Sequence, residues 1–113
     1  MASESARGII DNLLVEAWKL YGEGKPREAA EALERGNRES PGDIEVLYAL
    51  GLSLKKSEQA ESAVRAFRQV VELAAQRPSQ VRTLMLRRLA QGHVNILERG
   101  SWDLEAETWH REG

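Results

Sequence analysis

The residues best suited to catalysis or metal binding are the two histidines of the chain. His93 and His110 lie in different segments, and Glu107 with His110 forms one Glu-x-x-His pair. Helical bundles that hold two metal ions use such pairs twice, on two helices, and this sequence contains no second pair. The chain has no cysteine, which excludes disulfides and thiolate metal sites. We therefore expect no metal, no cofactor and no enzymatic activity.

Anion binding has only weak support in the sequence. Residues 22–25 read Gly-Glu-Gly-Lys, but a phosphate-binding loop needs a longer motif that follows a strand. Residues 79–99 carry a net charge of +3, yet the whole chain carries −2, and no aromatic residues interleave the arginines. We therefore expect no nucleic-acid binding.

The basic segment over residues 79–99 allows two interpretations. A solvated helix surface is the simpler one. The second is attraction of an acidic segment, either in a partner or in residues 100–113 of this chain, which carry −3.

Composition places the chain among small all-α proteins. Of its 113 residues, 42% are hydrophobic and 30% are charged, whereas 5% are aromatic. The β-branched residues form no alternating runs, so strands are not expected. No apolar run approaches the ~20 residues that a membrane-spanning helix requires, and the first ten residues lack the profile of a secretion signal. We therefore expect one domain over residues 1–113, in a cytoplasmic protein that does not enter a membrane.

Apolar and small residues recur at helical spacing over residues 44–73. The first set is Leu47, Leu50, Gly51 and Leu54, and the second is Ala60, Ala63, Phe67 and Val70. Steps of three and four place each set on one face of a helix. The polar residues 55–59 are few enough for a tight turn. We therefore predict an antiparallel helix pair, in which the small residues Gly51 and Ala63 let the two helices approach closely.

The same order of residues occurs 34 positions upstream, which indicates stacked helical repeats. The matched residues are Leu50, Gly51, Leu54, Ala63 and Phe67 in the second copy and Ala17, Leu20, Ala29, Leu33 and Pro41 in the first. With these residues the chain resembles the tetratricopeptide-repeat family, whose pattern is W-x2-L-G-x2-Y…A-x3-F…P. The resemblance implies a right-handed stack of antiparallel helix pairs.

A third, degenerate copy follows and predicts about six helices in all. Aligned on Gly100, it places a long helix over residues 80–99 and a short helix over about 102–111. Its apolar positions are Leu89, Ile96, Trp102 and Trp109, whereas Gly92 and His93 stand where the family has Leu and Gly. The predicted repeats cover about 10–43, 44–77 and 79–111. The last helix has one apolar face and is expected to close the stack.

The resemblance implies a non-catalytic scaffold for protein–protein interaction. In this family the first helix of each pair lines a concave groove that holds an extended peptide or an amphipathic helix. Carrying the groove positions over gives an aromatic and aliphatic strip with basic residues at its margin: Leu14, Trp18, Tyr21, Tyr48, Leu52, Lys55, Lys56 and Arg87. Exposed apolar strips with a polar rim mark interaction sites.

Two uses of this strip remain open. The basic clamp by which some members of the family bind chaperones is absent, because Leu14, Trp18 and Ala49 fill its positions. The strip can receive a protein or peptide partner, with an acidic segment facing the basic margin. Alternatively, it can form the interface of a structural homo-oligomer.

Overall fold

Five helices make up the described part of the chain. The computed structural model describes residues 2–77, 80–102 and 104. The helices are α1 (Ala2–Gly22), α2 (Pro26–Glu39), α3 (Ile44–Lys56), α4 (Ala60–Ala75) and α5 (Val81–Arg99). No strand occurs in these residues, which confirms the all-α prediction. The predicted sixth helix, over about 102–111, lies outside the described residues except for Trp102 and Leu104.

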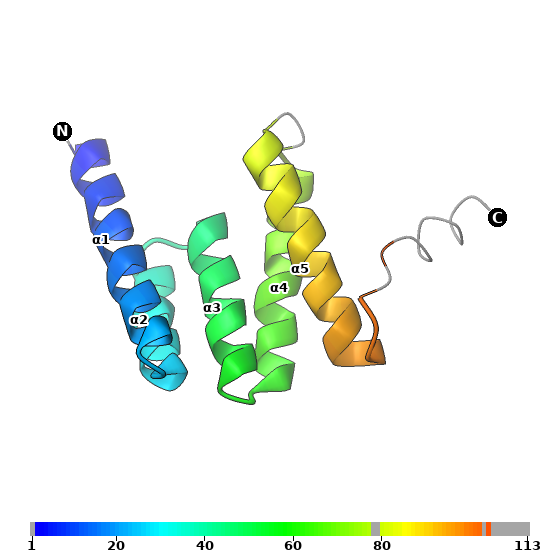
Figure 1. The fold of residues 1–113 in the computed structure, drawn as a ribbon. Helices are drawn as coiled ribbons and strands as arrows, with labels where there is room; N and C mark the ends of the chain where they lie inside the picture. The colour runs from blue at the N-terminus through cyan, green and yellow to red at the C-terminus, as the bar shows by residue number, and fades with distance from the viewer. Residues whose placement is uncertain (1, 78–79, 103, 105–113) are drawn as a thin grey trace.

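The helices stack as antiparallel hairpins. α1 packs on α2 and α3 packs on α4, while α5 packs on α4 without a described partner of its own. In addition, α1 contacts α3, and α3 contacts α5. They form one layer, with α2 and α4 in the other (Figure 1). In the part of the chain that is described, no helix is long and apolar enough to cross a membrane.

The two hairpin turns share one backbone geometry. In each, the N–H of the residue that precedes the second helix donates to a carbonyl five residues earlier, at 2.9 Å in both hairpins. The residue before that donor has a positive φ, which is 79° at Gly24 and 64° at Glu58. Glycine adopts this conformation without steric cost, whereas an L-residue with a side chain does not. The period of 34 residues in the sequence is therefore also a period of backbone conformation.

Small residues bring the helices of each hairpin close together, as predicted. Gly51 faces the fully buried ring of Phe67, and a Cβ atom at Gly51 would lie 2.6 Å from the Cε1 atom of that ring. Ala63 is also fully buried, and so are Ala17 and Ala29, its counterparts in the first hairpin. The ring of Phe67 thus packs directly against the backbone of α3.

The start of α3 is tied to the start of α1. The Oδ1 atom of Asp43 accepts a hydrogen bond from the backbone N–H of Val46 at 3.0 Å, which caps the helix. Its Oδ2 atom lies 3.1 Å from the Nη1 atom of Arg7 in α1. The residue that caps α3 therefore also helps to fix how α3 lies against α1.

The register of α5, which forms the third copy, is shifted by one residue from the predicted alignment. Leu89 and Ile96 fill two apolar positions of the predicted third copy, but both are exposed. Gly92, rather than His93, takes the place of Gly51, because a Cβ atom at Gly92 would collide with the indole ring of Trp102. Eight residues separate Gly92 from its turn glycine, Gly100, whereas seven separate Gly51 from Glu58. An alignment on the turn therefore rotates the expected faces of α5 by about 100°.

Candidate functional site

The candidate site is the face that α1, α3 and α5 share, which we call the inner surface. Its side chains are Arg7, Asp11, Trp18 and Tyr21 from α1, Glu45, Tyr48, Leu52 and Lys55 from α3, and Arg82 and His93 from α5. Ion pairs and hydrogen bonds between neighbouring helices join six of these residues: Arg7, Glu45, Arg82, Tyr48, Lys55 and His93. One group of contacts joins all three helices near the end where they begin, and a second group, further along, joins α5 to α3 and α4.

Charged residues cross the inner surface near the end where the three helices begin. An Nη atom of Arg7 lies 3.8 Å from one carboxylate oxygen of Glu45, and an Nη atom of Arg82 lies 2.8 Å from the other. Arg7 also pairs with Asp11, at 3.3 Å. Exposed pairs of this kind stabilise a fold by only about 0–1 kcal/mol each. Glu45 is thus held between cations from α1 and α5.

His93 joins α5 to α3 and α4 further along the surface. Its ring stacks on Phe67, with centroids 4.6 Å apart and planes 13° apart, and meets Trp102 edge-on at 4.9 Å. The Nδ1 atom lies 3.0 Å from the ammonium nitrogen of Lys55, and Nε2 lies 3.3 Å from the hydroxyl oxygen of Tyr48. Because an ammonium group can only donate, Nδ1 accepts. The ring proton is therefore on Nε2 and is donated to Tyr48.

These contacts keep His93 neutral. Burial, and secondly the charge of Lys55, lower the pKa of His93 from 6.5 to about 4. Burial, and secondly Tyr21, raise the pKa of the Tyr48 hydroxyl. At neutral pH the imidazole of His93 and the hydroxyl of Tyr48 are therefore uncharged, and the charge in this cluster is the ammonium group of Lys55.

Trp18 is the most exposed aromatic residue of the inner surface. Its side chain is 41% exposed, and it meets the ring of Tyr21 edge-on with centroids 5.7 Å apart. This contact orients the indole while leaving part of its face open. Tyr48 and Leu52 on the adjacent α3 are half-buried. The four residues form an apolar strip over α1 and α3, with Lys55 at its margin.

Two residues that the sequence assigned to this surface lie elsewhere. Leu14 is 8% exposed and belongs to the core. Lys56 lies beside the two hairpin turns, in an open cleft that Gly24 and Glu58 also line. Neither side chain extends the apolar strip.

Arg87 is a third residue that the structure places elsewhere. It precedes His93 by six residues and is therefore about 120° away around α5. It has no ion-pair partner among the residues that the structure describes. Arg82, which lies in line with His93 on the helix, reaches Glu45 instead. The one-residue shift in α5 explains why the sequence alignment pointed to Arg87, whereas Arg82 is the arginine of α5 that pairs with Glu45 on this surface.

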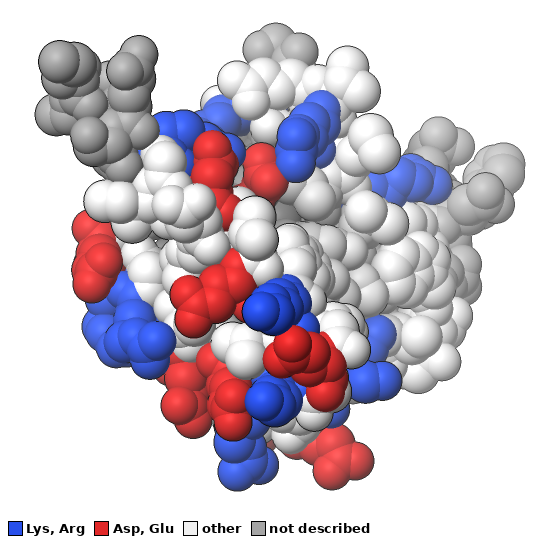
Figure 2. Space-filling view, turned by 60° about the vertical axis from the view of Figure 1, so that its left-hand side comes forward, with Lys and Arg blue, Asp and Glu red and all other residues white. Residues whose placement is uncertain are grey.

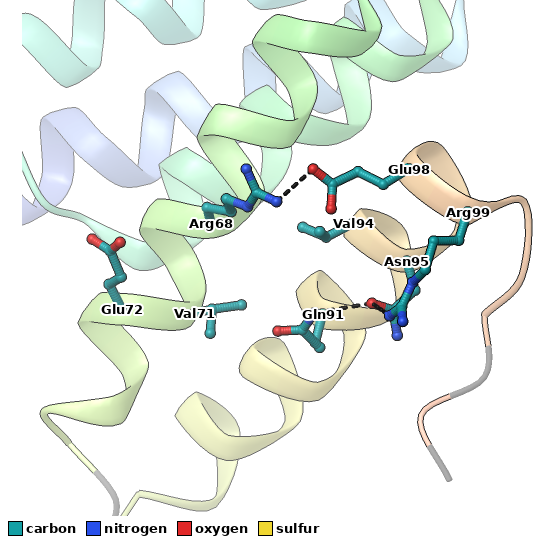
Figure 3. Close-up of a pocket in the computed structure, with 8 residues that line it drawn as sticks. All are labelled: Arg68, Val71, Glu72, Gln91, Val94, Asn95, Glu98 and Arg99. Carbon is teal, nitrogen blue, oxygen red and sulfur yellow. Dashed lines mark hydrogen bonds and ion pairs between the residues drawn. The ribbon is translucent and has the colours of Figure 1, made fainter. Parts of the chain in front are cut away.

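A polar cleft between α4 and α5 contains a residue that the sequence reasoning missed (Figure 3). Asn95 is buried, and its Oδ1 atom accepts hydrogen bonds from Gln91 at 3.0 Å and Arg99 at 2.7 Å. Its Nδ2 atom donates to the backbone carbonyl of Trp102 at 3.1 Å. Asn95 therefore fixes the chain that follows α5. An asparagine among charged residues near a helix end gave little signal of this role.

The surface chemistry suits binding to another chain segment. Acidic and basic side chains alternate over the face shown in Figure 2, beside a broad uncharged area. Among the described residues, no group of three or more His, Cys, Asp or Glu side chains could hold a metal ion. Beside the ion pairs around Glu45, the inner surface offers aromatic rings, aliphatic carbon and the ammonium group of Lys55, which is the chemistry of peptide recognition.

Comparison with known proteins identifies the architecture. No curated protein and no solved structure matches the chain. A family model described as tetratricopeptide repeat matches residues 20–87, which is more than half of the 113 residues. That range covers the second half of the first hairpin, all of the second hairpin and the beginning of α5. The chain belongs to the tetratricopeptide-repeat family.

Proposed function

We propose that this chain binds an amphipathic helix or an extended peptide of another protein on its inner surface, with Trp18 as the main anchor. Tetratricopeptide repeats are generally modules for protein–protein interaction. The observation that supports the site is the exposed indole of Trp18, held edge-on by Tyr21 at 5.7 Å. A large aromatic side chain with a fixed orientation loses little entropy on binding.

The flanking residues define the chemistry of the partner. Tyr48 and Leu52 extend the apolar strip from α1 onto α3, so the partner presents at least two apolar side chains. The contact with His93, at 3.0 Å, holds the ammonium group of Lys55 at the margin of this strip. A carboxylate of the partner can pair with that ammonium group, which sets orientation more than affinity.

Peptide selection with matched variants tests this proposal. Peptides are selected on the wild-type chain from a random display library, and one is synthesised with a fluorophore. Its Kd is then measured by fluorescence anisotropy. We expect Trp18→Ala to raise the Kd by at least tenfold, since a central tryptophan contributes about 2 kcal/mol or more.

Ile9→Ala is the matched control. Ile9 is also apolar and exposed, but it precedes Trp18 by nine residues and so lies on the opposite side of α1. The Kd of the selected peptide for the Ile9→Ala variant should stay within twofold of the value for the wild type. A selected peptide whose affinity is unchanged by Trp18→Ala, or lowered equally by both substitutions, would contradict the inner surface as the site.

A second candidate function is structural self-association at the free end of the first hairpin. An apolar cleft between α1 and α2 is lined by Ile9, Ile10 and Leu13, with Glu16 and Arg35 at its edge. Sedimentation from 1 to 100 μM tests this candidate. A dimer that Ile9→Glu disrupts would favour it, whereas a monomer at every concentration would exclude it.

A further inference from the structure

The first hairpin and α5 lie at opposite ends of the helix stack, and no described helix packs beyond either of them (Figure 1). At the end formed by the first hairpin, the cleft between α1 and α2 has a volume of about 290 Å³. Its apolar lining comes from Ile9, Ile10 and Leu13 of α1 and from Ala32 of α2, and Ile9 is exposed. This apolar groove is open in the part of the chain that the structure describes.

At the opposite end, α5 carries a ridge of exposed apolar side chains. Val81 is 72% exposed and Met85 is 59% exposed, and Leu89 is exposed as well. Steps of four residues place the three side chains along one side of the helix, and we call them the α5 stripe. The stripe rises by about 12 Å along α5, and the lining of the cleft from Ile9 to Glu16 rises by about 10 Å along α1. A ridge and a groove of similar length therefore lie at the two ends of one stack.

The charges at the two ends are opposite in sign. Residues 1–43 carry a net charge of −3, from nine acidic and six basic residues, whereas α5 carries +3, from four arginines and one glutamate. Glu16, Glu39 and Arg35 stand at the edge of the cleft, and Arg88 borders the α5 stripe, one position before Leu89. None of these four charged residues has an ion-pair partner within the described ranges. Unpaired charges therefore border both apolar surfaces.

A second copy of the chain meets the requirements of both surfaces. One chain cannot join its own cleft to its own stripe, because the two lie at opposite ends of the stack (Figure 1). Contact between two like ends would bring net charges of the same sign together, which is unfavourable. Contact between unlike ends instead joins an acidic region to a basic helix and buries apolar carbon on both sides.

We propose that the α5 stripe of one copy docks in the cleft between α1 and α2 of a second copy. Met85 then lies beside Ile9 of the second copy, and Arg88 pairs with a carboxylate at the edge of the cleft. Because the contact uses two different surfaces, each added copy leaves a free end, and linear assemblies grow with concentration. The proposal rests on the second candidate function, self-association at the first hairpin, and names the surface that the cleft receives.

Two variants that each block one end test the proposal by mixing. Ile9→Glu places a carboxylate at the cleft, and Met85→Glu places one on the α5 stripe; burial of either charge in the contact would be costly. Sedimentation velocity is measured at 100 μM for the wild type, for each variant alone and for an equimolar mixture. We expect dimers and longer assemblies of the wild type, and monomers of each variant alone. The mixture should form one-to-one dimers, because each variant keeps the surface that the other has lost.

Val15→Glu is the matched control for this experiment. Val15 is also apolar and exposed on α1, but it follows Ile9 by six residues, which is about 120° around the helix, and it does not line the cleft. This variant should associate as the wild type does. Circular dichroism checks that all three variants keep the helical content of the wild type.

The outcomes separate this proposal from the function on which it rests. Dimers of Met85→Glu alone would overturn the proposal but keep self-association at the first hairpin, because two clefts would then pair with each other. Dimers of Ile9→Glu alone would overturn it in favour of contact between two α5 stripes. A wild type that stays monomeric at 100 μM would overturn both and leave the α5 stripe to another protein or to the end of its own chain.

Charge reversal beside the stripe gives an independent result. Arg88→Glu should raise the dissociation constant of self-association at least fivefold, because it sets a carboxylate against the acidic edge of the cleft. Arg65→Glu changes the net charge equally, on the exposed side of α4, and should change the constant less than twofold. Equal effects of the two substitutions would overturn the proposed contact, since net charge alone would then explain them.

Discussion

The second hairpin and α5 place an aromatic ring on a helix glycine by two different routes. In the hairpin, the ring of Phe67 comes from the paired helix α4 and is fully buried on Gly51. In α5, the ring of Trp102 comes from the chain just past the helix, sits on Gly92, and is 37% exposed. The packing is alike, but the enclosed ring of Phe67 has less room to shift than the partly exposed ring of Trp102. We therefore expect the second hairpin to tolerate added volume less well than the contact between α5 and Trp102.

Adding one methyl group at each glycine should reveal this difference most strongly. We expect Gly51→Ala to lower the free energy of unfolding by about 1–3 kcal/mol, because the new Cβ atom overlaps a ring that has no space to move. Gly92→Ala should cost less than about 1 kcal/mol, because Trp102 can shift toward solvent. Urea denaturation of both variants measures the two values, and equal losses would contradict the distinction.

The first hairpin supplies a compensating substitution. Ala17 and Leu33 occupy the positions of Gly51 and Phe67. In the first hairpin an alanine thus replaces the glycine, and the smaller side chain of leucine replaces the phenylalanine ring. The double variant Gly51→Ala with Phe67→Leu should therefore be more stable than the sum of the two single losses predicts, by about 1 kcal/mol. Strict additivity in this double-mutant cycle would show that the two residues are not coupled.

The burial of His93 predicts that the free energy of unfolding depends on pH. Its pKa is about 4 in the folded chain, against an ordinary value of 6.5, so the unfolded chain takes up the proton first as the pH falls. The stabilisation is fully present above pH 6.5 and is lost as the pH falls toward 4. Since the ring is only half-buried, we expect the loss to be about 1–2 kcal/mol.

A comparison between two variants isolates this effect from the carboxylates that titrate in the same range. His110→Gln serves as the background, so that His93 is the only imidazole. The free energy of unfolding is measured by urea at pH 7 and pH 4.5, with and without His93→Gln. The fall in stability should be smaller when His93 is absent, and an equal fall would mean that its pKa is not lowered by folding.

The smallest expected effect concerns the turns. Glu58 has a φ of 64° where the first hairpin has Gly24, and a side chain in this conformation costs about 1–2 kcal/mol. Glu58→Gly removes this cost, but the greater conformational entropy of glycine in the unfolded chain offsets part of the gain in stability. We expect a net stabilisation of about 0.5–1 kcal/mol in urea denaturation. Glu58→Ala keeps the strain, and a similar gain for it would show that backbone strain is not the cause.

The regular half of the fold could be predicted from sequence because its signals repeat. The spacing from Ala17 to Gly51 and from Ala29 to Ala63 fixes the two hairpins, and every one of these residues is buried. The helix pairs followed from the same period, whereas the apolar strip through Trp18 came from the resemblance to the family and stays a prediction. Local chemistry and periodicity agree over residues 10–77, so few alternatives existed.

The rest could not be predicted because α5 has no second copy to fix its register. One extra residue before Gly100 turned Arg87 away from the inner surface and brought Arg82 and His93 onto it. The bonds that place His93, to Tyr48 and Lys55, join residues far apart in sequence. No pattern along a single helix reports such contacts, and the burial of Leu14 likewise depends on how closely the neighbouring helix packs.

The position of Glu45 between Arg7 and Arg82 has a mechanical consequence. At that end the three parallel helices are held by exposed charges, each pair worth about 0–1 kcal/mol. Further along, His93 of α5 contacts Tyr48 and Lys55 of α3 and stacks on Phe67 of α4, and separating these rings would expose buried carbon. We therefore expect these helices to separate more easily at the charged end than at the aromatic contacts of α5. A wide ligand would spread them from the charged side, and dissolved salt would ease that spreading.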